Sequence, residues 1–149
     1  MSVSDAIGEV VAERWIERTM KSYPAESLPY VQGERDPFRN PAGHLIEESL
    51  KTLAGELMGA MNERAIAPAL DGLLRLRAVQ SLSPSAALRF IFDLREVVAE
   101  VLGSVPKQLE ARIDELALTA FDCYMACREQ IAGLREKELR RFVTPGLTQ

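Results

Sequence analysis

The chain contains very little of what most metal and redox sites are built from. Its 149 residues include one histidine, His44, and two cysteines, Cys123 and Cys127. Two cysteines are too few for a disulfide framework, and their spacing of four places them on one face of a helix. A redox pair or half of a metal site remains an alternative, although a structural zinc site normally has four ligands. We expect both thiols to pack in the core as small hydrophobic groups, with no metal centre.

The sequence also lacks the short motifs that mark common catalytic sites. It contains no glycine-rich phosphate loop, no Gly-x-Ser-x-Gly and no His-Glu-x-x-His. The adjacent acids Glu47 and Glu48 do not face each other on a helix. Since no nucleophile, base and orienting group can be assembled, we expect that the protein is not an enzyme.

Long apolar runs and a large excess of charge of one sign are missing as well. No run approaches the ~20 apolar residues of a membrane-spanning helix. The formal net charge of −4 gives no general attraction to nucleic acid or anionic lipid. The N-terminus, Met1 to Asp5, lacks the basic start and apolar stretch of a secretory signal. We therefore expect a cytoplasmic protein with no membrane span and no nucleic-acid partner.

The chain does contain enough apolar residues for a core, and their spacing is helical throughout. Hydrophobic residues make up 47% of the sequence, and they recur at intervals of three and four. The expected helices cover about residues 4–22, 41–62, 63–82, 84–102 and 106–142. Ser4 is the expected cap of the first helix, and Pro68 is an alternative start for the third. This pattern predicts one all-α domain over residues 1–149, a bundle of about five to six helices.

Two segments are unusually dense in helix-entry signals. The first, Glu34 to His44, contains Asn40 as a cap and Pro41 at the first helical position. The second, Arg75 to Gln80, is followed by the cap and first-turn proline of Ser83-Pro84-Ser85. Together these segments resemble the N-terminal sensory domain of the RsbR family, the RsbT co-antagonist proteins of bacterial stress signalling, in its RsbRD-type version.

The resemblance runs roughly from Ile16 to Val101 and implies a signalling module. It implies a globin-like arrangement of helices without haem, and a last helix that leads into a C-terminal STAS domain and helps to form a dimer. This chain ends at Gln149 without a STAS domain or its phosphorylatable site, so the usual action on RsbT is not implied. The chain is either a fragment of a longer protein or a free-standing relative, and its start and its Pro145-Gly146 end favour the latter.

The single histidine bears on the question of haem. A globin's proximal histidine lies deep in a long helix past the middle of the chain, whereas His44 lies in the first turn of an early helix. We expect His44 to pack beside the preceding loop, with pH sensing as the alternative. We expect no haem and no other cofactor.

The candidate positions for binding a signal or a partner lie in the two helix-entry segments. They are Arg35, Asp36, Phe38, Arg39, His44, Arg75, Arg77 and Gln80. In the structural interpretation, Asp36 forms a turn, Phe38 anchors the loop on the core, and Arg35 or Asp36 pairs with Arg77 or Asp71.

A basic cluster is the other interpretation of the second segment. Arg75 and Arg77 could form an anion site together with Arg89 and Arg95. Acidic residues lie among them, so a solvated or internally paired surface is favoured.

Two further patterns concern contacts between helices. Gly55 and Gly59 form a Gly-x-x-x-Gly that would permit a close helix crossing within the fold or between subunits. The last helix carries mixed charges between Arg128 and Arg141, and Ile131, Leu134 and Leu139 could form a dimer contact there.

We therefore predict a non-enzymatic bacterial signalling domain that acts through protein–protein interaction or by binding a signal. Its expected partners are proteins of a signalling pathway and a second copy of the chain. The alternative is a small-molecule or cofactor carrier with a pocket between the helices.

Overall fold

The computed structural model describes residues 2–23 and 40–143. These residues form five helices and no strand: α1 (Val3–Lys21), α3 (Pro41–Met58), α4 (Glu63–Val79), α5 (Pro84–Leu102) and α6 (Lys107–Val143). The predicted all-α class is confirmed, and the globin-like arrangement stays a prediction. In the described part of the chain, none of the helices combines the length and apolar character needed to cross a lipid bilayer.

Local sequence signals explain where α3 and α5 begin. The Asn40 side chain accepts a hydrogen bond from the Gly43 N–H at 3.0 Å, with Pro41 at the first helical position. Ser83 caps α5 in the same way, and Pro84 follows it. Both predicted caps are confirmed. They could be predicted because a cap depends only on residues within one turn of it.

Three predicted boundaries were wrong by a few residues. The cap of α1 is Ser2 rather than Ser4, because Ser2 and Asp5 form a reciprocal capping box. Asn62 belongs to α4 as its cap, accepting from the Arg64 N–H at 3.0 Å, and does not end the preceding helix. α4 ends at Val79 rather than near residue 82. Its predicted start at Glu63 is right, and the alternative start at Pro68 is wrong, because Pro68 lies inside the helix.

A long-range contact accompanies the early end of α3. The Arg112 guanidinium of α6 donates to the carbonyls of Leu57 and Gly59, at 2.7 and 2.9 Å. It thereby satisfies carbonyls that the last turn of a helix leaves free.

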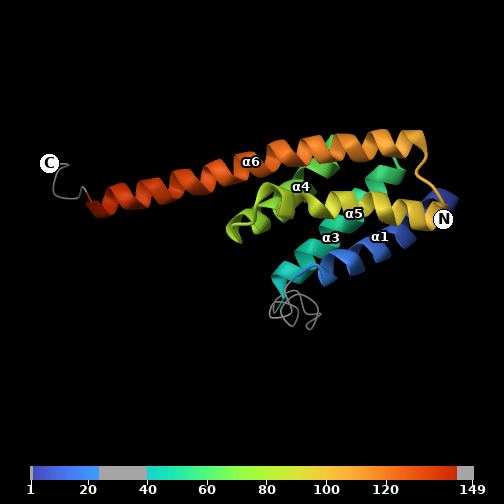
Figure 1. The fold of residues 1–149 in the computed structure, drawn as a ribbon, viewed down its shortest axis with the longest axis horizontal. Coiled ribbons are helices and arrows are strands. Elements are labelled where there is room, and N and C mark those ends of the chain that lie inside the picture. Colours follow the sequence, from blue (N-terminus) through green and yellow to red (C-terminus); the bar gives the residue numbers. More distant parts are fainter. Residues whose placement is uncertain (1, 24–39, 144–149) are drawn as a thin grey trace.

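The helices form a closed ring of contacts around one core. α1 packs against α3 and α5, α4 packs against α3 and α6, and α5 packs against α6 (Figure 1). The largest fully buried side chains come from all five helices and include Trp15, Leu50, Leu73, Ile91 and Tyr124. This arrangement leaves the C-terminal ends of α1 and α4 close to the start of α5.

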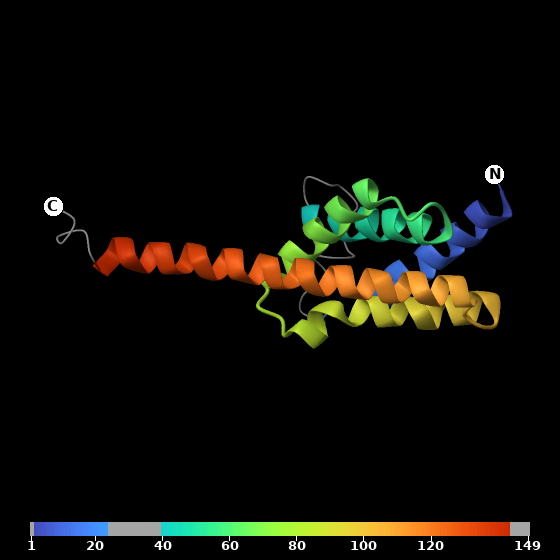
Figure 2. The same ribbon diagram turned by 90° about the horizontal axis from the view of Figure 1, so that it is seen from above.

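The last helix is much longer than the bundle that it belongs to. α6 has 37 residues and is therefore about 55 Å long. Its buried residues end at Cys127, and no side chain from Glu129 to Val143 is buried. Figures 1 and 2 show this end of α6 extending away from the other helices. We call residues 129–143 the α6 arm.

Candidate functional site

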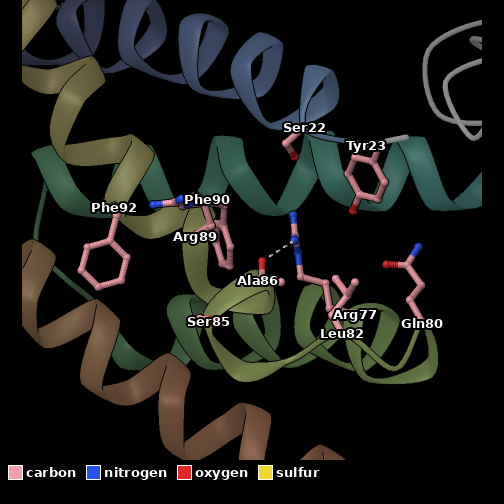
Figure 3. Close-up of a pocket in the computed structure, with 10 residues that line it drawn as sticks. All are labelled: Ser22, Tyr23, Arg77, Gln80, Leu82, Ser85, Ala86, Arg89, Phe90 and Phe92. Atoms are coloured by element: carbon pink, nitrogen blue, oxygen red, sulfur yellow. Dashed lines mark hydrogen bonds between the residues drawn. The ribbon is translucent and has the colours of Figure 1, made fainter. Parts of the chain in front are cut away.

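A pocket of about 880 Å³ opens where the ends of α1 and α4 meet the start of α5 (Figure 3). Its lining combines basic, hydroxyl and aromatic side chains: Ser22, Tyr23, Arg77, Gln80, Leu82, Ser85, Ala86, Arg89, Phe90 and Phe92. Its size suits a small organic ligand. None of these ten residues carries a carboxylate, so its lining charge is positive.

Arg77 is the most unusual residue of the pocket. It is a buried arginine, with 4% of its surface exposed, on the apolar face of α4. Its carbon Cζ lies 5.4 Å from the centre of the Tyr23 ring and 5.1 Å from the centre of the Phe90 ring. Figure 3 shows the guanidinium between these two residues. Both contacts are cation–π interactions, which position the group without neutralising its charge.

The hydrogen bonds of Arg77 leave most of its donors unused. Nη1 donates to the Ala86 carbonyl at a long distance of 3.4 Å. Nε and Nη2 are buried and have no hydrogen-bond partner among residues 2–23 and 40–143. An arginine with this burial normally has a carboxylate beside it, because an uncompensated buried charge is costly.

Burial also affects the pKa of the groups around Arg77. It lowers the pKa of the guanidinium, against a smaller opposing effect of the Tyr23 hydroxyl. Burial raises the pKa of Tyr23, whose hydroxyl has no hydrogen-bond partner in the described part of the chain. Burial and then Glu96 raise the pKa of Asp93, on α5, whose charge also acts on Arg77. These groups are therefore held in a poorly hydrated region of one surface of the bundle.

The ring of Phe90 connects this pocket to the core. Trp15 stacks on Phe90 with ring centres 5.9 Å apart, and its Nε1–H donates to the Phe90 carbonyl at 2.6 Å. Phe90 therefore lies between the indole of Trp15 and the guanidinium of Arg77. Trp15 is the only tryptophan of the chain, so its fluorescence reports on this pocket.

The structure places the predicted site residues that it describes in different surroundings. Arg77 and Gln80 both line the pocket. Arg75 is exposed instead, and its Nε donates to Asp71 at 2.8 Å, an internally paired surface charge. His44 is exposed in the first turn of α3. The predicted residues Arg35, Asp36, Phe38 and Arg39 lie outside the described residues, so their roles stay predictions.

Arg89 and Arg95, which sequence grouped with Arg77, point to different surroundings. Arg89 lines the pocket. Arg95 pairs with Glu110 at 2.8 Å and with Asp114, both on α6. Of the four arginines in the basic cluster, only Arg77 and Arg89 line the pocket, while Arg75 and Arg95 form ion pairs with acidic side chains, as the favoured interpretation expected.

Tyr23 and Phe90 were missed as site residues, although one sequence signal pointed to their neighbour. Leu70, Leu73, Leu74 and Arg77 follow one another at helical spacing, so Arg77 falls on the apolar stripe of α4. A cation in such a stripe is a strong indication of a buried charge. The identity of the rings beside it depends on how α1 and α5 pack, which the local sequence does not encode.

The two cysteines lie together with Asp71 between α4 and α6. One ligand atom from each of Asp71, Cys123 and Cys127 lies within 4.8 Å of the others. Burial raises the pKa of Cys123 to about 12, with Cys127 adding to the shift, and burial also raises the pKa of Cys127. Protonated thiols, with Cys127 buried and Cys123 half-buried against the core, agree with core packing, while the geometry would also suit a metal ion. The expectation of no metal therefore stays a prediction.

The Gly-x-x-x-Gly of α3 does not form a close helix crossing within the described bundle. A methyl group on Gly55 would meet nothing within 4 Å, and one on Gly59 would meet the Gly55 carbonyl of its own helix. The close approaches are elsewhere. A methyl group on Gly72 would come within 3.2 Å of Leu45, and one on Gly8 within 3.6 Å of Met58.

Comparison with known proteins places most of the chain in one family. The family model described as "RsbT co-antagonist protein rsbRD N-terminal domain" matches residues 9–139. An uncharacterized protein of Archaeoglobus fulgidus is 27% identical over 132 residues, which are 86% of this chain and 82% of the archaeal protein. No solved structure matches the chain.

Proposed function

Since the chain belongs to the family of RsbT co-antagonist protein rsbRD N-terminal domains, we propose that it is a non-enzymatic regulatory module of stress signalling. We propose that it works in the cytoplasm through protein–protein contact. The α6 arm makes this contact, and the partner is a second copy of the chain. The resemblance named from the sequence is confirmed at the level of the family, and the family match reaches into the arm.

The observation that carries this proposal is the continuity of the apolar face of α6. Within the bundle, Leu116, Ala120, Tyr124 and Cys127 are buried at spacings of four and three. Ile131 and Leu134 continue this row at spacings of four and three, but Ile131 is half-buried and Leu134 is 62% exposed. Ile131 still packs against the core of its own bundle. The same helix face therefore has a partner as far as Ile131 and lacks one, among the described residues, from Leu134 onward.

Two of the exposed apolar residues at the end of the arm differ in their alignment with this row. Phe142 lies eleven residues, about three turns, after Ile131, so it returns to the same face. It is 88% exposed and was missed in the sequence. Leu139, which was predicted to contribute, lies five residues after Leu134 and therefore on a neighbouring face.

The stability of the arm also favours a partner. Isolated helices shorter than about 12–15 residues are marginal in water, and the arm extends over residues 129–143 without a buried side chain. Within the arm, Arg140 pairs with Glu136 at 2.7 Å, and this exposed ion pair contributes only about 0.3–0.5 kcal/mol. A contact along the apolar row supplies the stabilisation that the arm does not obtain from its own bundle.

The charge of the arm fits a second copy of this chain. Residues 129–143 carry four basic and three acidic side chains, whereas the whole chain has a formal net charge of −4. A slightly basic arm is attracted by the acidic body of another copy. An arm of this length is about 22 Å long, which gives an interface near the lower limit for a stable dimer. The dimer is therefore weak and depends on concentration.

The experiment is sedimentation velocity of the purified protein between roughly 5 and 500 μM, a range that brackets the weak dimer affinities expected for a small interface. We expect a shift from monomer to dimer, and Leu134→Glu should weaken dimerisation at least tenfold because it places a charge in the apolar row. Leu118→Glu is the matched control, since Leu118 is 71% exposed on the same helix within the bundle. A wild-type protein that stays monomeric throughout, or an equal effect of both substitutions, would contradict the proposal.

A further inference from the structure

The geometry around Arg77 points to a function that the α6 contact does not include. We propose that the pocket is a binding site for a small carboxylic acid with an apolar body, such as an aromatic or medium-chain acid. In this site the Arg77 guanidinium binds the carboxylate, and the aromatic side chains of the pocket cover the apolar body. The argument rests on the hydrogen bonds, burial, charge and shape of the pocket.

The donors of Arg77 without a partner among the described residues lie on the edge of the guanidinium that binds carboxylates. Nη1 is engaged with the Ala86 carbonyl on α5. The two buried atoms without a partner are Nε and Nη2, whose N–H bonds point in parallel from one side of the group. Parallel N–H bonds on one edge are the arrangement that binds both oxygens of a carboxylate. The bond to Ala86 thus fixes the rotation of the group, and the paired-donor edge has no hydrogen-bond partner among the described residues. Less than 1 Å² of each of these two nitrogen atoms is exposed, so the side chains that cover the edge must move aside when a carboxylate binds.

The burial of Arg77 makes an anion favourable at this edge. Only 4% of the residue is exposed, so water compensates its charge poorly. No salt bridge of Arg77 with a described residue is present. Because burial already penalises the cation, a bound carboxylate regains interaction energy that the free protein lacks.

The lining selects for negative charge on the ligand. Arg89 adds a second cation at the rim, and none of the ten lining residues is acidic. Gln80 and Ser85 supply further donors. The carboxylate of Asp93 acts on Arg77 from α5, but it does not line the pocket. The electrostatics of the opening therefore favour an anion over a neutral or cationic ligand.

The shape of the lining selects for an apolar body. Tyr23 and Phe90 hold the guanidinium, and Leu82 and the 55% exposed Phe92 add apolar surface along the pocket. Figure 3 shows Phe92 on the far side of Phe90 from Arg77, so the pocket has a cation at one end and an exposed ring at the other, which matches a ligand with one charged and one apolar end. A guanidinium edge binds both carboxylates and phosphates through two parallel hydrogen bonds, and it is the apolar lining that favours an acid with an apolar body over inorganic phosphate.

The fluorescence of Trp15 gives a direct binding assay, because Trp15 stacks on Phe90. The probes are benzoate, 4-phenylbutyrate and octanoate. Octanamide is the uncharged analogue of octanoate, and inorganic phosphate is an anion without an apolar body. We expect a saturable change with at least one carboxylate, and at least tenfold weaker binding of octanamide than of octanoate. Equal binding of amide and acid would overturn the proposal. So would tighter binding of phosphate, or no saturable change with any carboxylate up to 10 mM, about the weakest affinity a specific site of this size would show.

Variants test whether Arg77 is the binding group. Arg77→Met keeps most of the volume and removes the charge, so binding should fall at least 100-fold. Arg77→Lys keeps the charge but loses the paired donors, so binding should fall at least tenfold. Arg75→Met is the matched control: Arg75 is two residues away, exposed and paired with Asp71, and its loss should leave affinity unchanged. A full-affinity Arg77→Met protein would overturn the proposal.

The outcome for the pocket is distinguishable from the outcome for the α6 contact. Leu134→Glu should bind the carboxylate with unchanged affinity while it weakens dimerisation. Circular dichroism and thermal unfolding of each variant confirm that a loss of binding is not a loss of the fold.

Discussion

Arg77 is a residue at which binding and stability have opposite requirements. A buried cation without a counterion destabilises the folded state, and replacement of buried charges by apolar groups of similar volume is often neutral or stabilising. We therefore expect Arg77→Met to leave the free energy of unfolding unchanged or to raise it by about 1–2 kcal/mol. Urea unfolding followed by circular dichroism measures this difference. A loss of more than about 2 kcal/mol would show that the protein itself compensates the charge.

Cys123 gives a prediction about pH. Burial raises the pKa of this thiol to about 12 in the folded state, against about 8.5 in the unfolded chain. Stability from the protonated thiol is therefore complete below pH 8.5 and is lost as the pH rises toward 12. We expect the free energy of unfolding to fall by roughly 1 kcal/mol between pH 8 and 9.5, measured by urea unfolding.

Substitution of the same cysteine provides the control. Cys123→Ala removes one titrating thiol, so its unfolding free energy should fall less over this pH interval. At pH 9.5 an unfolded tyrosine with a pKa of about 10 is only about one quarter ionised, so Tyr23, whose pKa is also raised by burial, adds little to this fall. A slope that Cys123→Ala does not change would contradict the assignment.

We also expect zinc to leave the melting temperature of the protein unchanged. A zinc-dependent rise of the melting temperature that Asp71→Asn removes would instead favour a metal site.

The sequence predicted part of the candidate site because Arg77 and Gln80 lie beside a helix end rich in polar groups. The same argument included Arg75, which points to solvent and pairs with Asp71. Two positions on a helix separate these arginines by about 200°, and only Arg77 falls on the apolar stripe. Tyr23 could not be predicted, because its place beside Arg77 depends on the packing of α1 against the other helices.

At the scale of the element, helix entries were predicted better than helix lengths. Asn40-Pro41 and Ser83-Pro84 act within one turn, so they are visible in the sequence. The end of α3 has a partner 53 residues away from Gly59 in Arg112. No local pattern contains that contact, and the predicted helix was therefore four residues too long.

Two glycines have opposite effects on their helices: Gly103 ends α5, whereas Gly55 lies inside α3. Gly103 ends α5 with φ of +84°, a left-handed conformation, so Gly103→Ala should cost about 1 kcal/mol of stability. Gly55 lies inside α3 with open space where a methyl group would be placed, so Gly55→Ala should stabilise by up to about 1 kcal/mol. Urea unfolding of both variants measures the two signs.

The result for Gly55 also bears on the Gly-x-x-x-Gly pattern. A close crossing with another subunit, which the sequence left open, would make Gly55→Ala unfavourable for association. Unchanged sedimentation of this variant is expected if the contact lies in the α6 arm. A loss of dimer in Gly55→Ala with an intact arm would move the interface to α3.

At the scale of the whole molecule, the sequence predicted the all-α class. It did not predict which part of the last helix extends beyond the bundle. Ile131 and Leu134 continue the spacing of Ile113 and Leu116 without interruption. The periodicity of a stripe indicates that a helix face has a partner, and it does not say whether the partner belongs to the same molecule. That distinction required the positions of α4 and α5.

Amide hydrogen exchange measures the stability of the arm within the intact protein. In dilute solution we expect the amides of residues 132–143 to exchange much faster than those of residues 113–127, because no side chain of the arm is buried. At high concentration the arm amides should become protected together as the dimer forms. Protection of the arm that is complete and independent of concentration would contradict a weak contact between copies.

The Leu82 carbonyl, in the turn between α4 and α5, holds α6 at the point from which its exposed end extends. It accepts hydrogen bonds from the Tyr124 hydroxyl and, at 3.0 Å, from Arg128, both at the point where α6 leaves the bundle. The same residue, Leu82, lines the pocket at the end of α4. A tilt of about 10° at this fulcrum moves the tip of a 22 Å arm by about 4 Å. A displacement smaller than a side chain at the pocket would thus become several times larger at the far end of α6, where the apolar row would meet the proposed second copy.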